Sequence, residues 1–193
     1  MYPEKLICAN ERILLIDHFK RLGPDDRYLR FGYQVHDEQI EDYINNSFNI
    51  EGNQWFGLFD RGIIIGTIHV ALLGDAQAEM GLSVDSKCRG AGIGQALFNR
   101  GLVWARARGT TQIYMQCLSE NKIIQHIAKK NGMIVATIDR TEQEARLEFP
   151  IVDYTAPFND MALDRITAVD KMYKTQQTFY NNMVSIWAKG KLK

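Results

Sequence analysis

Residues 79–97 read EMGLSVDSKCRGAGIGQAL and join an alternating strand pattern, a glycine-rich turn and the start of a helix. Gly90, Gly92 and Gly94 have no Cβ, so their backbone N–H groups are able to approach a ligand closely and curl around an anion. The helix that follows directs the positive end of its dipole at the same place. The stretch therefore predicts a binding site for a pyrophosphate group.

Two other glycine-rich phosphate sites fit this stretch less well. A dinucleotide-binding turn needs G-x-G-x-x-G with an acidic residue further along, and a P-loop ends in G-K-S or G-K-T. Neither pattern is present here. The remaining alternative is a tight strand-to-helix turn that binds no ligand, because glycines also serve that purpose.

The composition is that of one domain with one sizeable hydrophobic core. The 193 residues are 46% hydrophobic, and 23 Lys and Arg balance 23 Asp and Glu. Without excess positive charge, general binding to nucleic acid is disfavoured. The first residues lack a signal-peptide pattern, and no apolar run reaches the ~20 residues of a membrane span. We expect a cytoplasmic protein with neither a nucleic-acid nor a membrane partner.

The spacing of cysteines and histidines gives no metal site. Cys8, Cys88 and Cys117 are scattered and form no C-x-x-C pair, which suits reduced thiols in a cytoplasm. The four histidines show no ligand spacing either. We expect no metal, and a buried, inert thiol for Cys117 in its apolar strand.

The order of elements predicts an α/β fold, with a mixed sheet flanked by helices. Apolar periodicity indicates two helices between residues 10 and 48, joined by a bent loop at 22–31 because Gly23 and Pro24 break the first helix. Further helices are expected at 92–108 and from Asn121 to Gly132. Strand patterns, with a hairpin turn at 60–62, occupy residues 54–59, 62–73, 76–84, 112–118, 133–138 and 144–149.

The last part of the chain predicts one more, long helix. Residues 160–188 carry apolar side chains near heptad spacing. We therefore divide the chain into a domain at 1–150 and a C-terminal helical extension at 151–193. The apolar stripe of the extension needs a cover, which is its own domain, a second copy in a homodimer, or a partner protein.

The sequence RGAGIG at 89–94, which follows LSVD at 82–85 after three intervening residues, resembles the acetyl-CoA loop of the GNAT acetyltransferase superfamily. The resemblance covers residues 10–150. Segment 22–31 is also similar to the first helical loop of bacterial acetyltransferases that modify protein lysines. The resemblance implies a GNAT-like sheet, acetyl-CoA (coenzyme A) as co-substrate, and two strands, at 82–84 and 112–118, that splay apart to admit the cofactor.

The family pattern also implies roles for single residues. The backbone of Leu82 and Val84 would pair with the pantetheine arm and polarise the thioester. Asn121, at the family's helix-opening asparagine, would touch the same arm, and asparagine is also a good N-cap. The pyrophosphate would be surrounded by Arg89, Gly90, Gly92, Gly94 and Gln95.

Glu79 is the candidate general base. An amine with a pKa near ~10 is almost wholly protonated at neutral pH, so a carboxylate must take its proton, directly or through water, before the nitrogen attacks. Glu79 lies near the middle of its strand, where many GNAT enzymes place a catalytic glutamate. The alternative is a solvated carboxylate, since Glu79, Gly81 and Ser83 alternate along a wetter face of the sheet.

The general acid of the family is missing from this chain. Many members carry a tyrosine seven residues after the helix-opening asparagine, and Ala128 occupies that position here. A thiolate whose conjugate acid has a pKa near ~8.5 is a fair leaving group that water is able to protonate. Ser119 is our substitute candidate for catalysis; Tyr114 is another, with packing as its alternative role.

These features favour an N-acetyltransferase acting on a primary amine of a protein lysine, an N-terminus or a small molecule. Its acceptor side would use the loop at 22–31, the second helix and the final hairpin, with candidate contacts from Arg27, Tyr28, Arg30 and Tyr33. The missing tyrosine supports an alternative, a non-catalytic acyl-CoA-binding module whose C-terminal helix recruits a partner. Nucleotide binding by the glycine loop is a third hypothesis.

Overall fold

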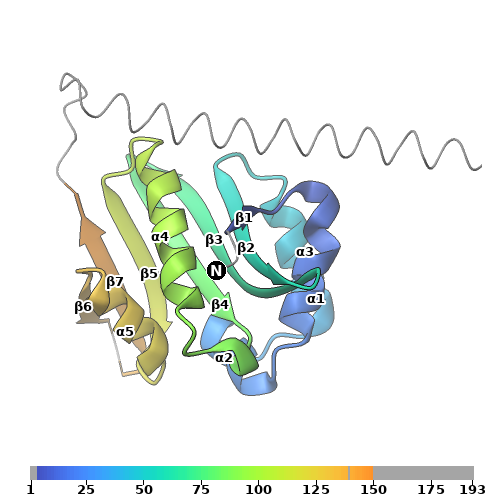
Figure 1. Ribbon diagram of the computed structural model, residues 1–193. Helices are drawn as coiled ribbons and strands as arrows, with labels where there is room; N and C mark the ends of the chain where they lie inside the picture. Colours follow the sequence, from blue (N-terminus) through green and yellow to red (C-terminus); the bar gives the residue numbers. More distant parts are fainter. Residues whose placement is uncertain (1–3, 139, 150–193) are drawn as a thin grey trace, which may run out of the picture. The chain divides into compact units, whose positions relative to one another are not determined.

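A seven-stranded mixed sheet forms the centre of the fold in a computed structural model that describes residues 4–138 and 140–149 (Figure 1). The strand order is β1-β2-β3-β4-β5-β7-β6, and β4 and β5 are its parallel pair. The strands are β1 (Lys5–Leu6), β2 (Asn53–Asp60), β3 (Ile63–Gly74), β4 (Gln77–Val84), β5 (Gln112–Leu118), β6 (Ile134–Thr137) and β7 (Glu142–Glu148). The α-helices are α1 (Arg12–Lys20), α2 (Pro24–Phe31), α3 (Asp37–Ser47), α4 (Ile93–Arg106) and α5 (Lys122–Lys130), and the short 3₁₀ turns are η1 (Ala9–Glu11) and η2 (Ser86–Cys88).

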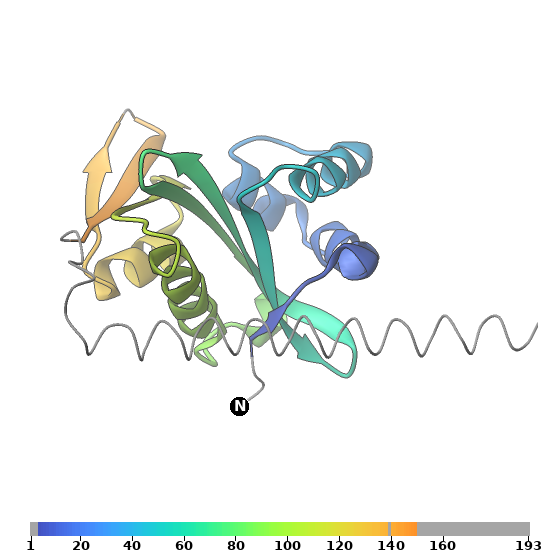
Figure 2. The ribbon, with the colours of Figure 1, turned by 90° about the horizontal axis from the view of Figure 1, so that it is seen from above.

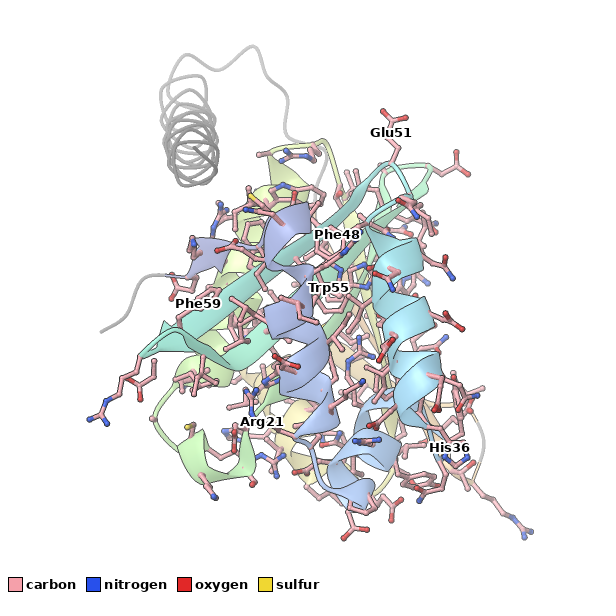
Figure 3. All side chains as sticks on the ribbon, turned by 90° about the vertical axis from the view of Figure 1, so that its right-hand side faces the viewer. Arg21, His36, Phe48, Glu51, Trp55 and Phe59 are labelled. Atoms are coloured by element: carbon pink, nitrogen blue, oxygen red, sulfur yellow. The ribbon has the colours of Figure 1, made fainter. Side chains whose placement is uncertain are left out.

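Helices cover both faces of the sheet, α4 and α5 on one side and α1 and α3 on the other (Figure 2). Each face has its own buried hydrophobic cluster. Phe98 and Trp104 of α4 belong to the first cluster, and Phe19 of α1 and Trp55 of β2 belong to the second. Figure 3 looks onto the second layer, where Trp55 lies between α1 and α3 in the view and its indole N–H donates to the Ser47 hydroxyl at 2.8 Å. Both faces of the sheet are therefore covered, and the buried hydrophobic residues form two clusters rather than the one core expected.

The segment from residue 12 to residue 47 contains three helices rather than the two expected. The bent loop predicted at 22–31 is wrong, because Pro24 starts α2 as well as ending α1. Proline suits the first helical position, where its missing N–H has no partner to lose. Asp25 and Asp26 in the first turn further stabilise the positive end of this helix. As a result, Leu29 and Arg30 are held on a helix that packs against β4 and β5.

The predicted strands and the mixed sheet are confirmed. Arg61 and Gly62 connect β2 to β3 with φ angles of 48° and 81°, as in a two-residue hairpin turn. The two-residue strand β1 was not expected. Among the described helices, none combines the length and apolar character needed to cross a membrane. The predicted C-terminal helix, and with it the proposed domain boundary, lies outside the described residues.

The strands β4 and β5 separate after a short paired stretch. Their register pairs Gln77, Ala78 and Glu79 with residues 112–114. Both strands continue well beyond this point, to Val84 and Leu118. Glu79 is thus the last β4 residue with a partner on β5, and the splay implied by the family resemblance is present in the fold.

Candidate functional site

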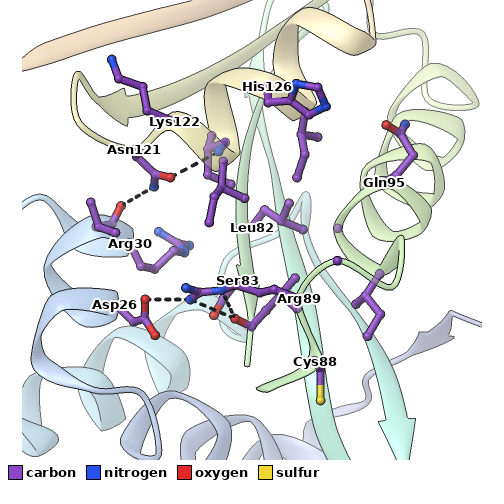
Figure 4. A pocket seen from close by; sticks show the side chains of 18 of the residues that line it. Asp26, Arg30, Leu82, Ser83, Cys88, Arg89, Gln95, Asn121, Lys122 and His126 are labelled. Atoms are coloured by element: carbon purple, nitrogen blue, oxygen red, sulfur yellow. Dashed lines mark hydrogen bonds and ion pairs between the residues drawn. The ribbon is translucent and has the colours of Figure 1, made fainter. Parts of the chain in front are cut away.

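A cavity of about 490 Å³ opens beside β4 where β4 and β5 separate (Figure 4). Its wall is built from α2, β4, the glycine turn, the first turn of α4 and most of α5. We call it the glycine-turn cavity. All of the residues predicted to hold the cofactor line it, namely Leu82, Val84, Arg89, Gly90, Gly92, Gly94, Gln95 and Asn121.

The glycine turn leaves the start of α4 open to an anion. Gly90 and Gly92 both have φ of 81°, in the left-handed region where a Cβ is costly. No side chain caps the first turn of α4, and no acidic residue lies in it. The N–H groups at this helix end therefore keep their partial positive charge, which suits a phosphate group.

Gly94 lets α4 approach both α5 and β4 closely. A Cβ at this position would lie 2.8 Å from Ile127 Cδ1 and 3.4 Å from Leu82 Cδ2. The first distance is well inside the ~3.5–4.0 Å at which two carbon atoms attract each other. Any larger residue would therefore press on α5, which forms a wall of the cavity.

The backbone of Leu82 and Val84 faces the gap between the strands. The Val84 carbonyl accepts from Arg89, at 3.3 Å from Nε and 3.2 Å from Nη2. Arg89 belongs to the cavity wall, so this carbonyl is turned toward the cavity. Because the direction of strand backbone groups repeats every second residue, Leu82 presents its N–H and C=O to the same side. An extended ligand arm is able to pair there as a further strand would.

Among the charged side chains of the described residues that line the glycine-turn cavity, most are basic. Lys122, His126 and Lys130 come from successive turns of α5. Among the described residues that line the cavity, Asp26 is the one acidic residue, and its Oδ1 lies 2.7 Å from Arg89 Nη2. None of the three α5 residues belongs to the predicted site, although their four-residue spacing puts them on one helical face and is visible in the sequence.

Two of the predicted polar residues already have hydrogen-bond partners. Asn121 caps α5, since its Oδ1 accepts from the Ile124 N–H at 3.2 Å, and its Nδ2 donates to the Leu29 carbonyl at 3.3 Å. The N-cap alternative is therefore present in the structure, and contact with a cofactor arm stays a prediction. Gln95 exchanges amide hydrogen bonds with Asn131 and so ties α4 to α5.

A second cavity, of about 360 Å³, lies between α2, α3 and the strands β3, β4, β5 and β7. We call it the Glu79 cavity. Glu79 is half-buried in its wall, and among the described residues its carboxylate has no hydrogen bond or ion pair. Leu29 and Arg30 line both cavities. The predicted base therefore lies in a cavity that adjoins the predicted cofactor site.

The two candidates for a general acid, Ser119 and Tyr114, line neither cavity. The Ser119 N–H donates to the Thr141 carbonyl at 2.8 Å and its hydroxyl to the Arg140 carbonyl at 3.3 Å. Ala128 is fully buried in the hydrophobic cluster beneath α4 and α5. Cys117 is also buried, and burial raises the pKa of its thiol, as the prediction of an inert cysteine requires.

The candidate acceptor contacts divide into two groups. Arg30 and Tyr33 line the Glu79 cavity, whereas Arg27 and Tyr28 line neither cavity. Arg27 instead pairs with Asp37 at 2.7 Å and donates to the backbone carbonyls of three residues around α2. It therefore fixes the arrangement of the helices.

Two histidines are buried on the face of the sheet that α1 and α3 cover. His18 Nδ1 lies 3.0 Å from the Ile64 carbonyl and Nε2 lies 3.0 Å from Ser83 Oγ; burial lowers the pKa of His18 to about 4. Burial, with the nearby Arg30 cation, lowers the pKa of His69 to about 3. Both rings are neutral at pH 7. Over residues 4–138 and 140–149, no three His, Cys, Asp or Glu side chains gather as metal ligands.

Comparisons with known proteins address the fold and the family. A family model described as "Acetyltransferase (GNAT) family" matches residues 21–133. The GNAT domain of S. lividans PAT has a TM-score of 0.66 and 15% identity, covering 76% of this chain and 89% of that chain. A ribosomal-protein-alanine N-acetyltransferase from Brucella melitensis has a TM-score of 0.61 and 14% identity, covering 76% of this chain and 99% of that chain. RimL, a ribosomal L7/L12 alpha-N-protein acetyltransferase in complex with coenzyme A, has a TM-score of 0.60 and 11% identity, covering 76% of this chain and 93% of that chain. No curated protein matches the chain.

Proposed function

The chain belongs to the GNAT family of acetyltransferases, and from this premise we propose that it transfers an acetyl group from acetyl-CoA to a primary amine. The observation that carries the proposal is the separation of β4 and β5. It lies beside a basic cavity at the glycine turn and a second cavity that holds Glu79.

The glycine-turn cavity has the features that coenzyme A requires. The uncapped start of α4 and the N–H groups of Gly90–Gln95 suit the pyrophosphate. Arg89 and Lys130 line this cavity and carry positive charge that suits the phosphates, whereas the Lys122 ammonium donates to the Ser119 carbonyl at 2.6 Å. The exposed backbone of Leu82 and Val84 suits the amide-bearing pantetheine arm, which would bring the thioester to the point where the strands part.

The Glu79 cavity supplies the base and the space for the acceptor. Glu79 removes a proton from the ammonium group, directly or through water, and the free amine attacks the thioester carbon. Backbone N–H groups at Leu82 and Val84 stabilise the negative charge that develops on the carbonyl oxygen. The C–N bond forms, the C–S bond breaks, and the departing thiolate takes a proton from water. Since Ser119 donates to a backbone carbonyl away from both cavities, we assign it no step.

Thermal unfolding tests the cofactor assignment. At a concentration of about 100 times the Kd, acetyl-CoA should stabilise the fold by ~2.7 kcal/mol, which corresponds to a Tm increase of roughly 5–10 °C for a chain of this size. ATP is the control ligand, because it has phosphates but no pantetheine arm. A shift with ATP and none with acetyl-CoA would favour the nucleotide-binding hypothesis instead.

A non-catalytic acyl-CoA-binding module remains the second candidate. The buried Ala128 favours it, since this residue stands where many family members carry the tyrosine that protonates the thiolate. Release of free thiol from acetyl-CoA, measured across a panel of amines, separates the two: a transferase releases thiol with an amine present, and a binding module releases none.

A further inference from the structure

The guanidinium of Arg30 lies between the two cavities without an acidic partner. Within the described residues its Nη2 donates to the Tyr43 hydroxyl at 3.1 Å, and its Nε is buried with no hydrogen-bond partner. None of the ion pairs in this part of the chain includes Arg30. Arg30 is half-buried, and a cation partly removed from water without a counter-charge costs free energy of folding. A bound anion would offset that cost.

Arg30 is held against β4 at one point. A Cβ at Gly81 would overlap Arg30 Nη2 and would lie 2.7 Å from Cζ, so the guanidinium rests on the strand backbone. Three aromatic rings surround it, with Cζ 5.9 Å from the centroid of Phe19, 5.1 Å from Phe31 and 5.8 Å from Tyr43. These contacts fix the position of the charge but do not neutralise it.

His69 adds a second unsatisfied group beside Arg30. It is 8% exposed, stacks on Trp55 at 4.3 Å, and stands opposite Gly81 in the β3–β4 register. The Tyr43 hydroxyl accepts from Arg30 and lies 3.0 Å from His69 Nδ1, while His69 Nε2 has no partner. If the hydroxyl donates to Nδ1, the neutral ring carries its proton on Nε2. A positive charge and an N–H donor then share one wall of the Glu79 cavity.

Glu79 lies on the same face of β4, two residues before Gly81. Two residues of a strand span roughly 7 Å. The cavity therefore presents a carboxylate and a guanidinium a short distance apart, next to the gap between β4 and β5. An amine near Glu79 and a carboxylate on Arg30 fit this arrangement.

We propose that Arg30, together with Tyr43 and His69, binds a carboxylate group of a substrate where the two cavities meet. The inference rests on the proposed function, because it assumes that the Glu79 cavity receives a substrate. Carboxylate is a planar anion that a guanidinium holds with two parallel hydrogen bonds. It comes either from an amino-acid acceptor or from the acyl chain of a dicarboxylic acyl-CoA, since Arg30 lines both cavities.

Binding measurements test the carboxylate site without requiring turnover. Calorimetry, with and without CoA, compares N-acetyl-leucine with N-acetyl-leucinamide for the acceptor arm and succinyl-CoA with acetyl-CoA for the acyl arm. The variant is Arg30→Met, which keeps an unbranched apolar stem among the rings. Arg12→Met is the matched control, because Arg12 is exposed at the start of α1.

The wild type should bind the carboxylate-bearing ligand of one pair about tenfold or more tightly than its partner, and Arg30→Met should lose this preference. The pair that shows it identifies the source of the carboxylate. Arg12→Met should keep it. The Tm of Arg30→Met without ligand should stay close to that of the wild type, since removal of an uncompensated charge offsets the lost hydrogen bond to Tyr43 and the lost ring contacts.

The inference is overturned if neither pair shows a preference, if the preference survives in Arg30→Met, or if that variant weakens both members of each pair equally. Thiol release with amines that carry no carboxylate would, in any of these cases, leave the proposed function intact. A carboxylate preference in a protein that releases no thiol would leave the anion site intact and remove the transferase.

Discussion

Gly94→Ala tests the contact between α4 and α5 that closes the glycine-turn cavity. The new Cβ would lie 2.8 Å from Ile127 Cδ1. Overpacking of this kind costs ~1–3 kcal/mol, and replacing glycine by alanine in a helix returns at most ~1 kcal/mol. The net loss should be about 0–2 kcal/mol in urea unfolding, or a Tm decrease of up to roughly 8 °C.

Ile127→Val provides the control, because this substitution deletes the Cδ1 atom that the new Cβ meets. In that background Gly94→Ala should be neutral or stabilising, so the double-mutant cycle should give a favourable coupling of ~0.5–3 kcal/mol. Acetyl-CoA affinity should fall in Gly94→Ala and recover in the double variant, since the cavity wall is restored. Equal effects of Gly94→Ala in the two backgrounds would refute the close contact.

Three further predictions concern the core, the buried histidines and the phosphate site. Ala128→Tyr should lower the free energy of unfolding by ~3 kcal/mol or more, because residue 128 is fully buried; a normally stable variant with faster thiol release would instead place it at the substrate. Stability should decline as pH falls from 6.5 toward about 4, since folded His18 resists the proton that the unfolded chain accepts. His18 alone adds up to ~1.4 kcal/mol per pH unit to this slope, so the slope should be shallower in His18→Asn, and an unchanged slope would argue against a buried neutral ring. Arg89→Met should weaken CoA binding about tenfold in calorimetry and reduce its salt dependence, whereas unaltered affinity would remove Arg89 from the phosphate site.

That residues 82–95 share the wall of one cavity was predictable because they are close in sequence. Residues 82–95 form a strand end, a turn and a helix start, and each depends on local patterns that are read directly from the chain. The same local reasoning failed at Pro24, where one residue both ends α1 and starts α2. The basic face of α5 was visible in the spacing of Lys122, His126 and Lys130.

The Glu79 cavity was predictable only in part, because long-range packing creates it. Arg30, Tyr43 and His69 come from α2, α3 and β3. They meet because of the register of the sheet and because residues 24–31 form a helix where we predicted a loop. No periodicity in the sequence connects them. The position of Ser119 likewise depends on the hairpin that follows it, whose Arg140 and Thr141 carbonyls take its hydrogen bonds.

Thiol release from acetyl-CoA by the wild type and by Glu79→Gln tests the central claim most directly. Glu51→Gln is the matched control, since Glu51 is exposed in the turn before β2. With an amine acceptor at neutral pH, Glu79→Gln should be slower by about 10²–10⁴-fold, with unchanged Tm and acetyl-CoA affinity, while Glu51→Gln should match the wild type. Equal rates for Glu79→Gln and the wild type, or no thiol release with any amine, would contradict acetyl transfer with Glu79 as the base.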